Sequence, residues 1–280
     1  MPELAYINGQ FCSIEQAMVP LEDRGYQFGD AVYEVIVSYN GCLFCLEEHL
    51  IRLERSMQEL LFPPISLEMI RNAICDLFDR ANLARAEIYL QISRGVAPRK
   101  HAFMNTKDFQ FVMTIRRIEE KLTTLREKGA AAITLEDFRW GRCDIKTVQL
   151  LPNVLAKQKA LDAGAFDAIF VTKEGVVREA TSSNIFIVID GRLITHPLTP
   201  NILSGITRLV IIDICKDLSI PVEEQFYSTD DMYLSNEVFL TGTTTEVLPV
   251  VHIDKNRIGD GKVGPVSKKL YQELRGRIEG

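Results

Sequence analysis

Three tight turns constrain the fold of this chain more strongly than any other feature of its 280 residues. Asn8-Gly9, Asn40-Gly41 and Asp190-Gly191 each separate two short runs of apolar and β-branched residues. Asn-Gly and Asp-Gly pairs tolerate the left-handed backbone that two-residue hairpin turns require. The turns therefore predict antiparallel hairpins near the N-terminus, near residue 40 and near residue 190.

Amphipathic helical patterns alternate with strand-like runs along the whole chain. Apolar residues recur at helical spacing in the segments 46–61, 66–81, 154–163, 204–218 and 263–278. Strand-like runs occupy 4–7, 10–12, 32–39, 42–44, 87–93, 109–115, 131–136, 168–172, 184–189, 192–195, 238–240 and 247–253. Because hairpins and helices mix in both halves, we expect an α/β fold of the α+β type. The charged segment 116–128 separates the halves, which predicts a smaller domain over 1–120 and a larger one over 121–280.

Composition argues against several classes of function. Apolar residues make up 46% of the chain. Its net charge is −6, and the sequence contains no block of like charges. A nucleic-acid partner is therefore not expected. No apolar run approaches the ~20 residues of a membrane span, and the N-terminus lacks the apolar segment of a signal peptide. We expect a cytoplasmic protein without a membrane partner.

The cysteines and histidines do not predict a metal site. The six cysteines are scattered, and we expect reduced thiols. Cys42 and Cys45 form a CxxC pair, but two ligands do not make a zinc site, and we expect both to be buried strand residues. The four histidines are far apart and show no metal-ligand spacing.

Lys146 lies in the stretch GRCDIKTVQLLPN, where mostly apolar residues follow it. That setting is compatible with partial burial of the lysine. Burial lowers the pKa of a lysine and makes the neutral amine available as a nucleophile or base, which Schiff-base chemistry requires. From spacing alone, a solvated surface lysine remains the simpler interpretation.

Two hydroxyl-rich stretches and one helix start are candidate walls of a polar pocket. The run EATSSN places Glu179 beside several hydroxyls, although a local turn explains it more simply. The helix expected from Ser204 has free amide groups and a dipole that attract anions. Thr207 adds a hydroxyl there, and the second hydroxyl-rich stretch, GTTT (242–245) after a strand, adds Thr243; ordinary turns explain these residues equally well.

The segment Arg94–Asp108 is too polar for a core and long for a plain connection between strands. Arg99 and His101 within it are candidates for binding a carboxylate, because a guanidinium binds that group with two parallel hydrogen bonds. A basic surface loop is the alternative. Tyr33, inside a strand, is more typical of a core. Composition and pattern alone thus predict a two-domain protein with several anion-binding turns.

Taken together, six stretches resemble the fold-type IV enzymes that use pyridoxal 5′-phosphate, over nearly the whole chain. In order they are RGYQFGDAVYE (24–34), HLIRL (49–53), the Lys146 stretch, EATSSN (179–184), GITR (205–208) and TTTE (243–246). This family includes D-amino-acid aminotransferases, branched-chain aminotransferases and aminodeoxychorismate lyases. RGYQFGD, RGVAPRKH (94–101) and RCDIK are most similar to the D-amino-acid branch. The Arg99-x-His101 pair separates that branch from the branched-chain enzymes.

The resemblance implies a cofactor and the residues that hold it. Lys146 would hold the aldehyde of pyridoxal phosphate covalently, and Glu179 would keep the pyridine nitrogen protonated. Leu203 would pack beneath the ring. The phosphate would be bound by Arg52, Ile206, Thr207 and Thr243. The substrate α-carboxylate would be bound by Tyr33, Arg99 and His101.

The resemblance also implies a homodimer in which the larger domain carries the cofactor lysine, and Arg99 and His101 reach in from the partner subunit. The implied reaction is ping-pong transfer of an amino group from a D-amino acid, such as D-alanine, to a 2-oxo acid, such as 2-oxoglutarate. A branched-chain L-amino-acid or (R)-amine aminotransferase and an aminodeoxychorismate lyase remain alternatives. Gly242 and Val37 depart from the serine and lysine of the D-specific pattern, which leaves the preferred substrate side chain open.

Overall fold

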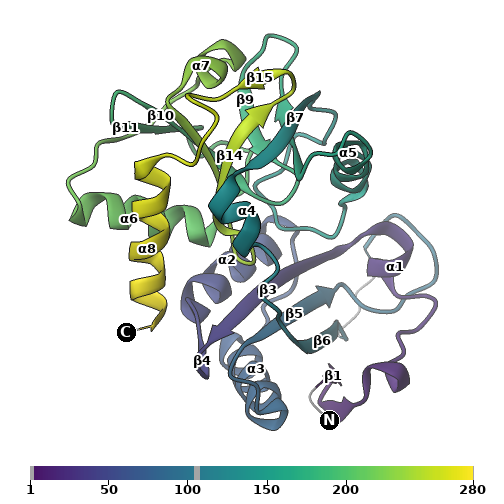
Figure 1. The fold of residues 1–280 in the computed structure, drawn as a ribbon. Helices are drawn as coiled ribbons and strands as arrows, with labels where there is room; N and C mark the ends of the chain where they lie inside the picture. Colours follow the sequence, from purple (N-terminus) through teal and green to yellow (C-terminus); the bar gives the residue numbers. More distant parts are fainter. Residues whose placement is uncertain (1–2, 104–107, 280) are drawn as a thin grey trace. The chain divides into compact units, whose positions relative to one another are not determined.

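The computed structural model describes residues 3–103 and 108–279, and the chain forms two compact units (Figure 1). The first unit contains the chain up to Glu119 together with Ile145–Gln149. The second contains Glu120–Asp144 and the chain from Leu150 onward. Lys146 therefore belongs to the first unit, although the chain on both sides of it belongs to the second. The division into independent domains at 1–120 and 121–280 stays a prediction.

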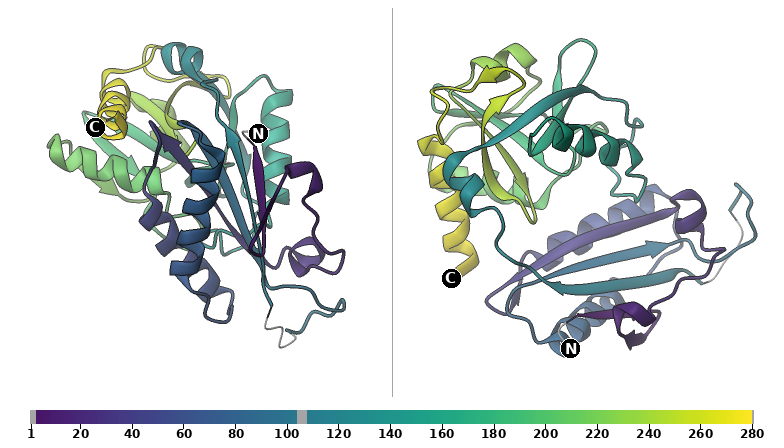
Figure 2. Two further views of the ribbon diagram at one scale, coloured as in Figure 1. Left: turned by 90° about the horizontal axis from the view of Figure 1, so that it is seen from below. Right: turned by 45° about the vertical axis from the view of Figure 1, so that its right-hand side comes forward.

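The first unit is a six-stranded antiparallel sheet with two helices on one face (Figure 2). Its strand order is β2-β1-β6-β5-β3-β4. The strands are β1 (Leu4–Ile7), β2 (Gln10–Cys12), β3 (Ala31–Tyr39), β4 (Cys42–Leu43), β5 (Ala86–Ser93) and β6 (Gln110–Arg117). The helices are α1 (Arg24–Phe28), α2 (Leu46–Glu59) and α3 (Leu67–Ala81), with a 3₁₀ turn at Ile14–Gln16. Alternate residues of β3 and β5, such as Ile36 and Ile88, pack with Leu53 of α2 and Ile74 of α3 in the core.

The second unit is a nine-stranded mixed sheet. Its order is β12-β11-β10-β13-β14-β7-β8-β9, and β15 pairs with β14. The strands are β7 (Ala130–Glu136), β8 (Asp167–Val171), β9 (Val177–Ala180), β10 (Asn184–Ile189), β11 (Arg192–Thr195), β12 (Val222–Glu224), β13 (Glu237–Gly242), β14 (Glu246–Ile253) and β15 (Asn256–Arg257). The helices are α4 (Thr123–Lys128), α5 (Leu151–Asp162), α6 (Ile206–Asp217), α7 (Thr229–Leu234) and α8 (Pro265–Glu279). Helix α5 packs on β8, while α6 and α8 pack on each other and on β13.

The predicted hairpin turns are confirmed. Asn8, Asn40 and Asp190 have φ angles of 49°, 50° and 49°, which is the left-handed backbone that these turns require. The long helices and the predicted strands lie within a few residues of their expected positions. The expected mixed α/β architecture is confirmed.

Two expectations about local structure are wrong. Cys42 is exposed and Cys45 half-buried, because β4 is only two residues long and lies at the edge of the sheet. Helix α6 begins at Ile206, not at Ser204, because the Asn184 side chain binds the Leu203 carbonyl at 2.9 Å and the backbone stays extended through Gly205.

No helix among residues 3–103 and 108–279 combines the length and the apolar composition needed to cross a bilayer.

Candidate functional site

Backbone hydrogen bonds hold the segment around Lys146 beside strand β3. Tyr33 N donates to the Lys146 carbonyl at 3.0 Å, and Val148 N donates to the Ala31 carbonyl at 3.2 Å. The Lys146 side chain is half-buried, and its Nζ lies 4.2 Å from the centre of the Tyr33 ring. The structure shows no carboxylate paired with Nζ among the described residues. Lys146 is therefore partly buried, which the simpler surface interpretation did not predict, and its amine makes no salt bridge with a described residue.

A buried cluster of three ionisable groups lies on the α2 side of β3. Arg52 donates from Nε and Nη2 to the two oxygens of Glu34, at 2.7 Å each, and Nδ1 of His49 lies 2.7 Å from Glu34 Oε2. Glu34 is fully buried, and His49 and Arg52 are nearly so. Burial lowers the pKa of His49 below its usual value, while Glu34 opposes that shift. Arg52, which the resemblance implies as a phosphate ligand, is therefore held rigidly.

Glu34 makes the stability of the protein sensitive to acid. Burial alone would raise its pKa, but the charge and hydrogen bonds of Arg52, with those of His49, bring it down to about 2. A carboxyl with a depressed pKa stabilises the fold above its unfolded pKa, and this contribution is lost as the pH falls from about 4.5 to about 2. The size of the shift corresponds to a loss on the order of 3 kcal/mol. We expect urea titrations of the wild-type protein to show this loss between pH 5 and pH 2.

Replacing Glu34 by glutamine should lower the free energy of unfolding at pH 7 by about 3–5 kcal/mol, because Arg52 keeps a buried charge without its partner. The variant should also lose less stability than the wild type on acidification. Glu47→Gln is the matched control, because its pair with Arg71 is solvent-exposed and contributes little. Equal acid sensitivity in Glu34→Gln and wild type would contradict the assignment.

Glu179 is the centre of a second buried cluster, in the second unit. It lies on β9 and is 6% exposed. Its Oε2 accepts hydrogen bonds from Leu203 N at 3.0 Å and from Asn184 Nδ2 at 3.1 Å, and its Oε1 accepts one from Arg139 Nη1. Burial raises the pKa of Glu179, and the charge and hydrogen bond of Arg139 oppose the rise. A carboxylate has about four acceptor positions, so one remains for a further donor.

Arg139 is held in place by Asp137. Its Nε donates to Asp137 Oδ1 at 3.0 Å and its Nη2 donates to Oδ2 at 2.9 Å. Its guanidinium carbon also lies 4.4 Å from the centre of the Phe170 ring. Sequence analysis missed Arg139 and Asp137, because the contact to Glu179 joins residues 40 positions apart. It also missed Glu34, for which a signal existed: a charged residue inside an otherwise apolar strand.

The start of α6 is open to an anion. Ile206 and Thr207 lie in its first turn, the N-cap is Gly205, and no described side chain caps the helix. The first amides of a helix lack acceptors of their own, so this end favours a phosphate. A Cβ at position 205 would lie 2.1 Å from Asn184 Oδ1, so glycine is required there. Asn184 thereby links the α6 start to Glu179.

The remaining predicted residues of the second unit lie in neighbouring turns. Leu203 precedes α6, is half-buried, and donates its amide to Glu179. Thr243 is half-buried in the turn between β13 and β14. At Gly242 a Cβ would lie 3.2 Å from Ser183 Oγ, so a small side chain needs only a slight adjustment there.

The three predicted carboxylate-binding residues do not contact one another. Tyr33 is half-buried with its ring 5.7 Å from that of Tyr89. Arg99 and His101 are exposed, and each lies against the Phe28 ring, at 5.1 and 5.7 Å. Among the described residues, no hydrogen bond or ring contact joins Tyr33 to either of them. Residues 104–107 of the predicted loop Arg94–Asp108 lie outside the described part of the chain.

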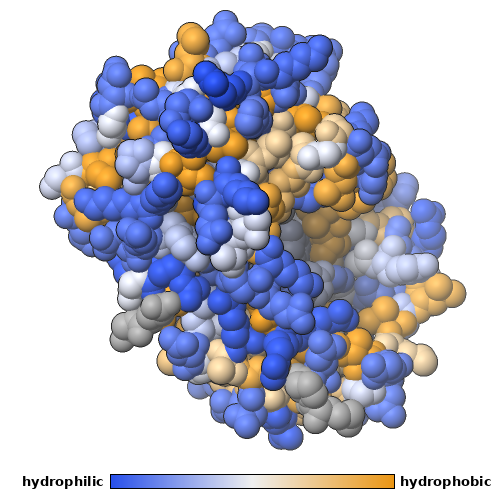
Figure 3. All heavy atoms as spheres, in the orientation of Figure 1, coloured by the Kyte–Doolittle hydropathy of each residue, from blue (hydrophilic) through white to orange (hydrophobic). Residues whose placement is uncertain are grey.

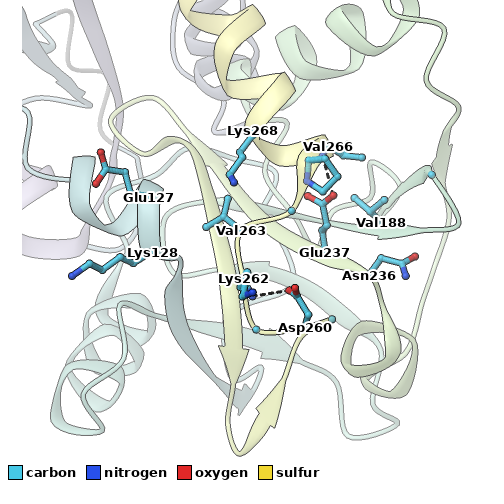
Figure 4. Close-up of a pocket in the computed structure, with 15 residues that line it drawn as sticks. Glu127, Lys128, Val188, Asn236, Glu237, Asp260, Lys262, Val263, Val266 and Lys268 are labelled. Atoms are coloured by element: carbon cyan, nitrogen blue, oxygen red, sulfur yellow. Dashed lines mark hydrogen bonds between the residues drawn. The ribbon is translucent and has the colours of Figure 1, made fainter.

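A cavity of about 920 Å³ in the second unit is not part of this site (Figure 4). None of the predicted site residues lines it. It lies at the start of α8, where the Glu237 carboxylate accepts hydrogen bonds from Val266 N and Ser267 N, both at 2.9 Å. A side-chain carboxylate thus already occupies the anion-binding end of that helix.

Known proteins are similar to this chain over most of its length. The family model for "Amino-transferase class IV" matches residues 31–253. D-alanine aminotransferases from Bacillus licheniformis and Staphylococcus haemolyticus are 40% and 41% identical to the chain over 275 residues. The alignments cover 97% and 98% of the chain and 95% and 97% of the relatives.

Two solved branched-chain amino acid aminotransferases have a similar fold. The enzyme from Escherichia coli is 28% identical with a TM-score of 0.91. The enzyme from T.th., solved with pyridoxamine 5′-phosphate, is 29% identical with a TM-score of 0.91. Each comparison covers 98% of this chain and 93% of the other.

Proposed function

Because the chain belongs to the class IV aminotransferase family, we propose that it is a D-amino-acid:2-oxo-acid aminotransferase with pyridoxal 5′-phosphate as cofactor. It transfers the amino group of a D-amino acid such as D-alanine to a 2-oxo acid such as 2-oxoglutarate. The observation that carries this proposal is the 39–42% identity, over nearly the full length, to relatives named D-alanine aminotransferase.

The residues in both units fit the cofactor's chemistry. Lys146 offers an amine without a salt bridge, Glu179 has one acceptor position left, and the start of α6 is uncapped. These groups match an aldehyde, a ring N–H and a phosphate. We propose that Lys146 binds the aldehyde and Glu179 the ring nitrogen, while Leu203 packs against the ring. The phosphate is bound by Arg52, the Ile206 and Thr207 amides, and Thr243.

The bound cofactor supplies an electron sink for the charge that develops at the substrate α-carbon. The protein's own contribution to that step is a positioned base. Lys146 would hold the cofactor through its Nζ, and the same amine, when free, would act as the base that moves the proton from the substrate α-carbon. The Nζ that would do this lies 4.2 Å from the centre of the Tyr33 ring.

Substrate recognition is assigned to Tyr33 and to Arg99 and His101 of the partner subunit in a homodimer. Exposed apolar side chains gather on α5, where Leu151, Val154 and Leu155 are 68%, 59% and 50% exposed (Figure 3). Such a patch supports a second copy of the chain as partner.

Light scattering should then give twice the chain mass of 31.7 kDa. A fully active monomer would contradict the dimer. A cytoplasmic location stays a prediction.

The substrate panel tests the function directly. The holoenzyme is incubated with the D- and L-forms of alanine, glutamate and leucine, with 2-oxoglutarate or pyruvate as acceptor. We expect 2-oxo acid from the D-enantiomers. A second candidate, a branched-chain L-amino-acid aminotransferase, is favoured by the TM-scores of 0.91 to such enzymes, although the identity to them is only 28–29%. Product from L-leucine alone would establish that candidate instead.

A further inference from the structure

Arg24 is a buried arginine that joins helix α1 to the segment carrying Arg99 and His101. Its side chain is 3% exposed. Nε donates to Asp30 Oδ2 at 2.8 Å, Nη1 to the Lys100 carbonyl at 2.6 Å, and Nη2 to the His101 carbonyl at 3.3 Å. One planar guanidinium fork therefore contacts a fixed carboxylate on one side and two successive peptide groups on the other.

Asp30 gives Arg24 a stationary partner. Nε of Arg94 donates to both Asp30 oxygens, at 3.1 and 2.9 Å. The other two nitrogens of Arg94 donate to the carbonyls of Leu61 and Leu60, just after α2, at 3.0 and 2.5 Å. The Asp30 carboxylate is thus tied to the helical layer of the first unit, and it cannot follow Arg24 if the segment shifts.

The peptide groups that Arg24 holds make no backbone hydrogen bond with another described residue, although the Phe103 ring lies 3.9 Å from the Arg94 guanidinium carbon. The last backbone hydrogen bond before them is from Ala97 N to the Glu22 carbonyl, at 3.2 Å. Among residues 3–103 and 108–279, no hydrogen bond between backbone groups involves residues 98–103. Within the described part of the chain, the two donations from Arg24 are therefore the hydrogen bonds that hold this backbone in place.

Phe28 completes the arrangement. Its ring lies 4.9 Å from the Arg24 guanidinium carbon and 5.1 Å from that of Arg99, and the His101 ring meets it edge-on at 5.7 Å. Phe28 thus packs against the side chains of Arg99 and His101, while Arg24 holds the backbone that carries them. Loss of Arg24 leaves the ring contacts without a fixed backbone behind them.

We propose that Arg24 is a positioning residue for substrate recognition: it holds residues 98–103 in the shape in which Arg99 and His101 bind the substrate α-carboxylate. The inference rests on the proposed function. Both substrates of the ping-pong reaction carry the same α-carboxylate beside the reacting carbon. A loosened segment must be ordered at each binding event, so the affinity for both substrates falls together.

The test uses Arg24→Met and Arg24→Lys in the full-length holoenzyme. Arg24→Met removes every donor and keeps an apolar side chain of similar length. We expect the KM values for D-alanine and for 2-oxoglutarate to rise by about ten- to hundredfold, because two charge-assisted hydrogen bonds are lost. We expect kcat to stay within about threefold, because Lys146 and Glu179 are untouched. Arg24→Lys should fall between, since an ammonium cannot reproduce the fork.

Trypsin gives a readout that does not depend on catalysis. Arg99 and Lys100 are exposed, so cleavage after them reports how often the segment opens. We expect faster cleavage at these two bonds in Arg24→Met, measured by mass spectrometry. Arg80→Met is the matched control, because Arg80 is an exposed arginine over another aromatic ring, at 4.3 Å from the centre of Phe11. It should change neither KM nor cleavage.

The outcomes separate this inference from the function on which it rests. If wild type transaminates D-alanine and Arg24→Met keeps both KM values, the positioning role is overturned. A fall in kcat and melting temperature at unchanged KM would likewise show a purely structural residue. If wild type does not use D-alanine, the proposed function fails. The cleavage rates still test whether Arg24 holds residues 98–103. If Arg24→Met does not fold, Arg24→Lys carries both measurements.

Discussion

Replacing Lys146 by alanine is expected to lower the rate of amino transfer from D-alanine by about 10⁴-fold or more. The substitution removes both the amine that binds the cofactor and the base that moves the proton, and positioned proton transfer alone contributes about 10²–10⁴-fold. The visible absorption of the purified protein should be lost at the same time. Both are measured on wild type and variant purified in parallel, with pyruvate formation as the assay.

Lys173→Ala is the control for Lys146→Ala. Lys173 is 76% exposed and lies 3.6 Å from Glu136, so its removal should leave colour and rate unchanged. The thermal unfolding of Lys146→Ala should resemble that of the wild type without added cofactor, because the Nζ of Lys146 has no salt bridge to lose. A yellow Lys146→Ala protein that still produces pyruvate from D-alanine would remove the basis of the proposed function.

Replacing Glu179 by glutamine is expected to lower kcat by about 10²–10³-fold, the usual cost of deleting one preorganised electrostatic contact in an active site. An amide cannot hold a proton on the pyridine nitrogen as a carboxylate does, so charge at the substrate α-carbon is stabilised less. Arg139 keeps Asp137 as a partner, and the fold should survive. Single-turnover reaction with D-alanine, followed by absorbance, measures the effect on the chemical step.

The KM for D-alanine should change much less than kcat in Glu179→Gln, because Glu179 is not assigned to the carboxylate of the substrate. Glu174→Gln, at an exposed position near the same strand, is the control and should behave as wild type. A kcat within threefold of wild type would show that Glu179 supports the structure around Asn184 and Leu203 without acting on the cofactor.

Sequence predicted those parts of the fold that depend on neighbouring residues. The turns at Asn8, Asn40 and Asp190 follow from backbone preferences of two residues, and all three occur. The short helix α1 and the strand β9 were missed, because elements of five and four residues show no clear period and no Asn-Gly or Asp-Gly turn flanks these two. The start of α6 was misplaced because a side chain from β10, Asn184, decides it.

The candidate site was predictable only in part for the same reason. The residues after Lys146 indicated its partial burial, but its contact with Tyr33 depends on a pairing with β3 that no local pattern encodes. The roles of Arg52 and Glu179 came from the resemblance, whereas their partners Glu34 and Arg139 came from the structure. Buried ion pairs join segments distant in sequence, and a single sequence does not show which charges meet.

The assignment of Ile145–Gln149 to the first unit limits how this protein can be recombined. The polypeptide passes from the first unit to the second, returns for five residues and leaves again. A chimaera made by one crossover near residue 120 would join one parent's Tyr33 to the other parent's Lys146 segment. Exchange of a whole unit between two related proteins, in the laboratory or in evolution, would therefore need three junctions at matching positions.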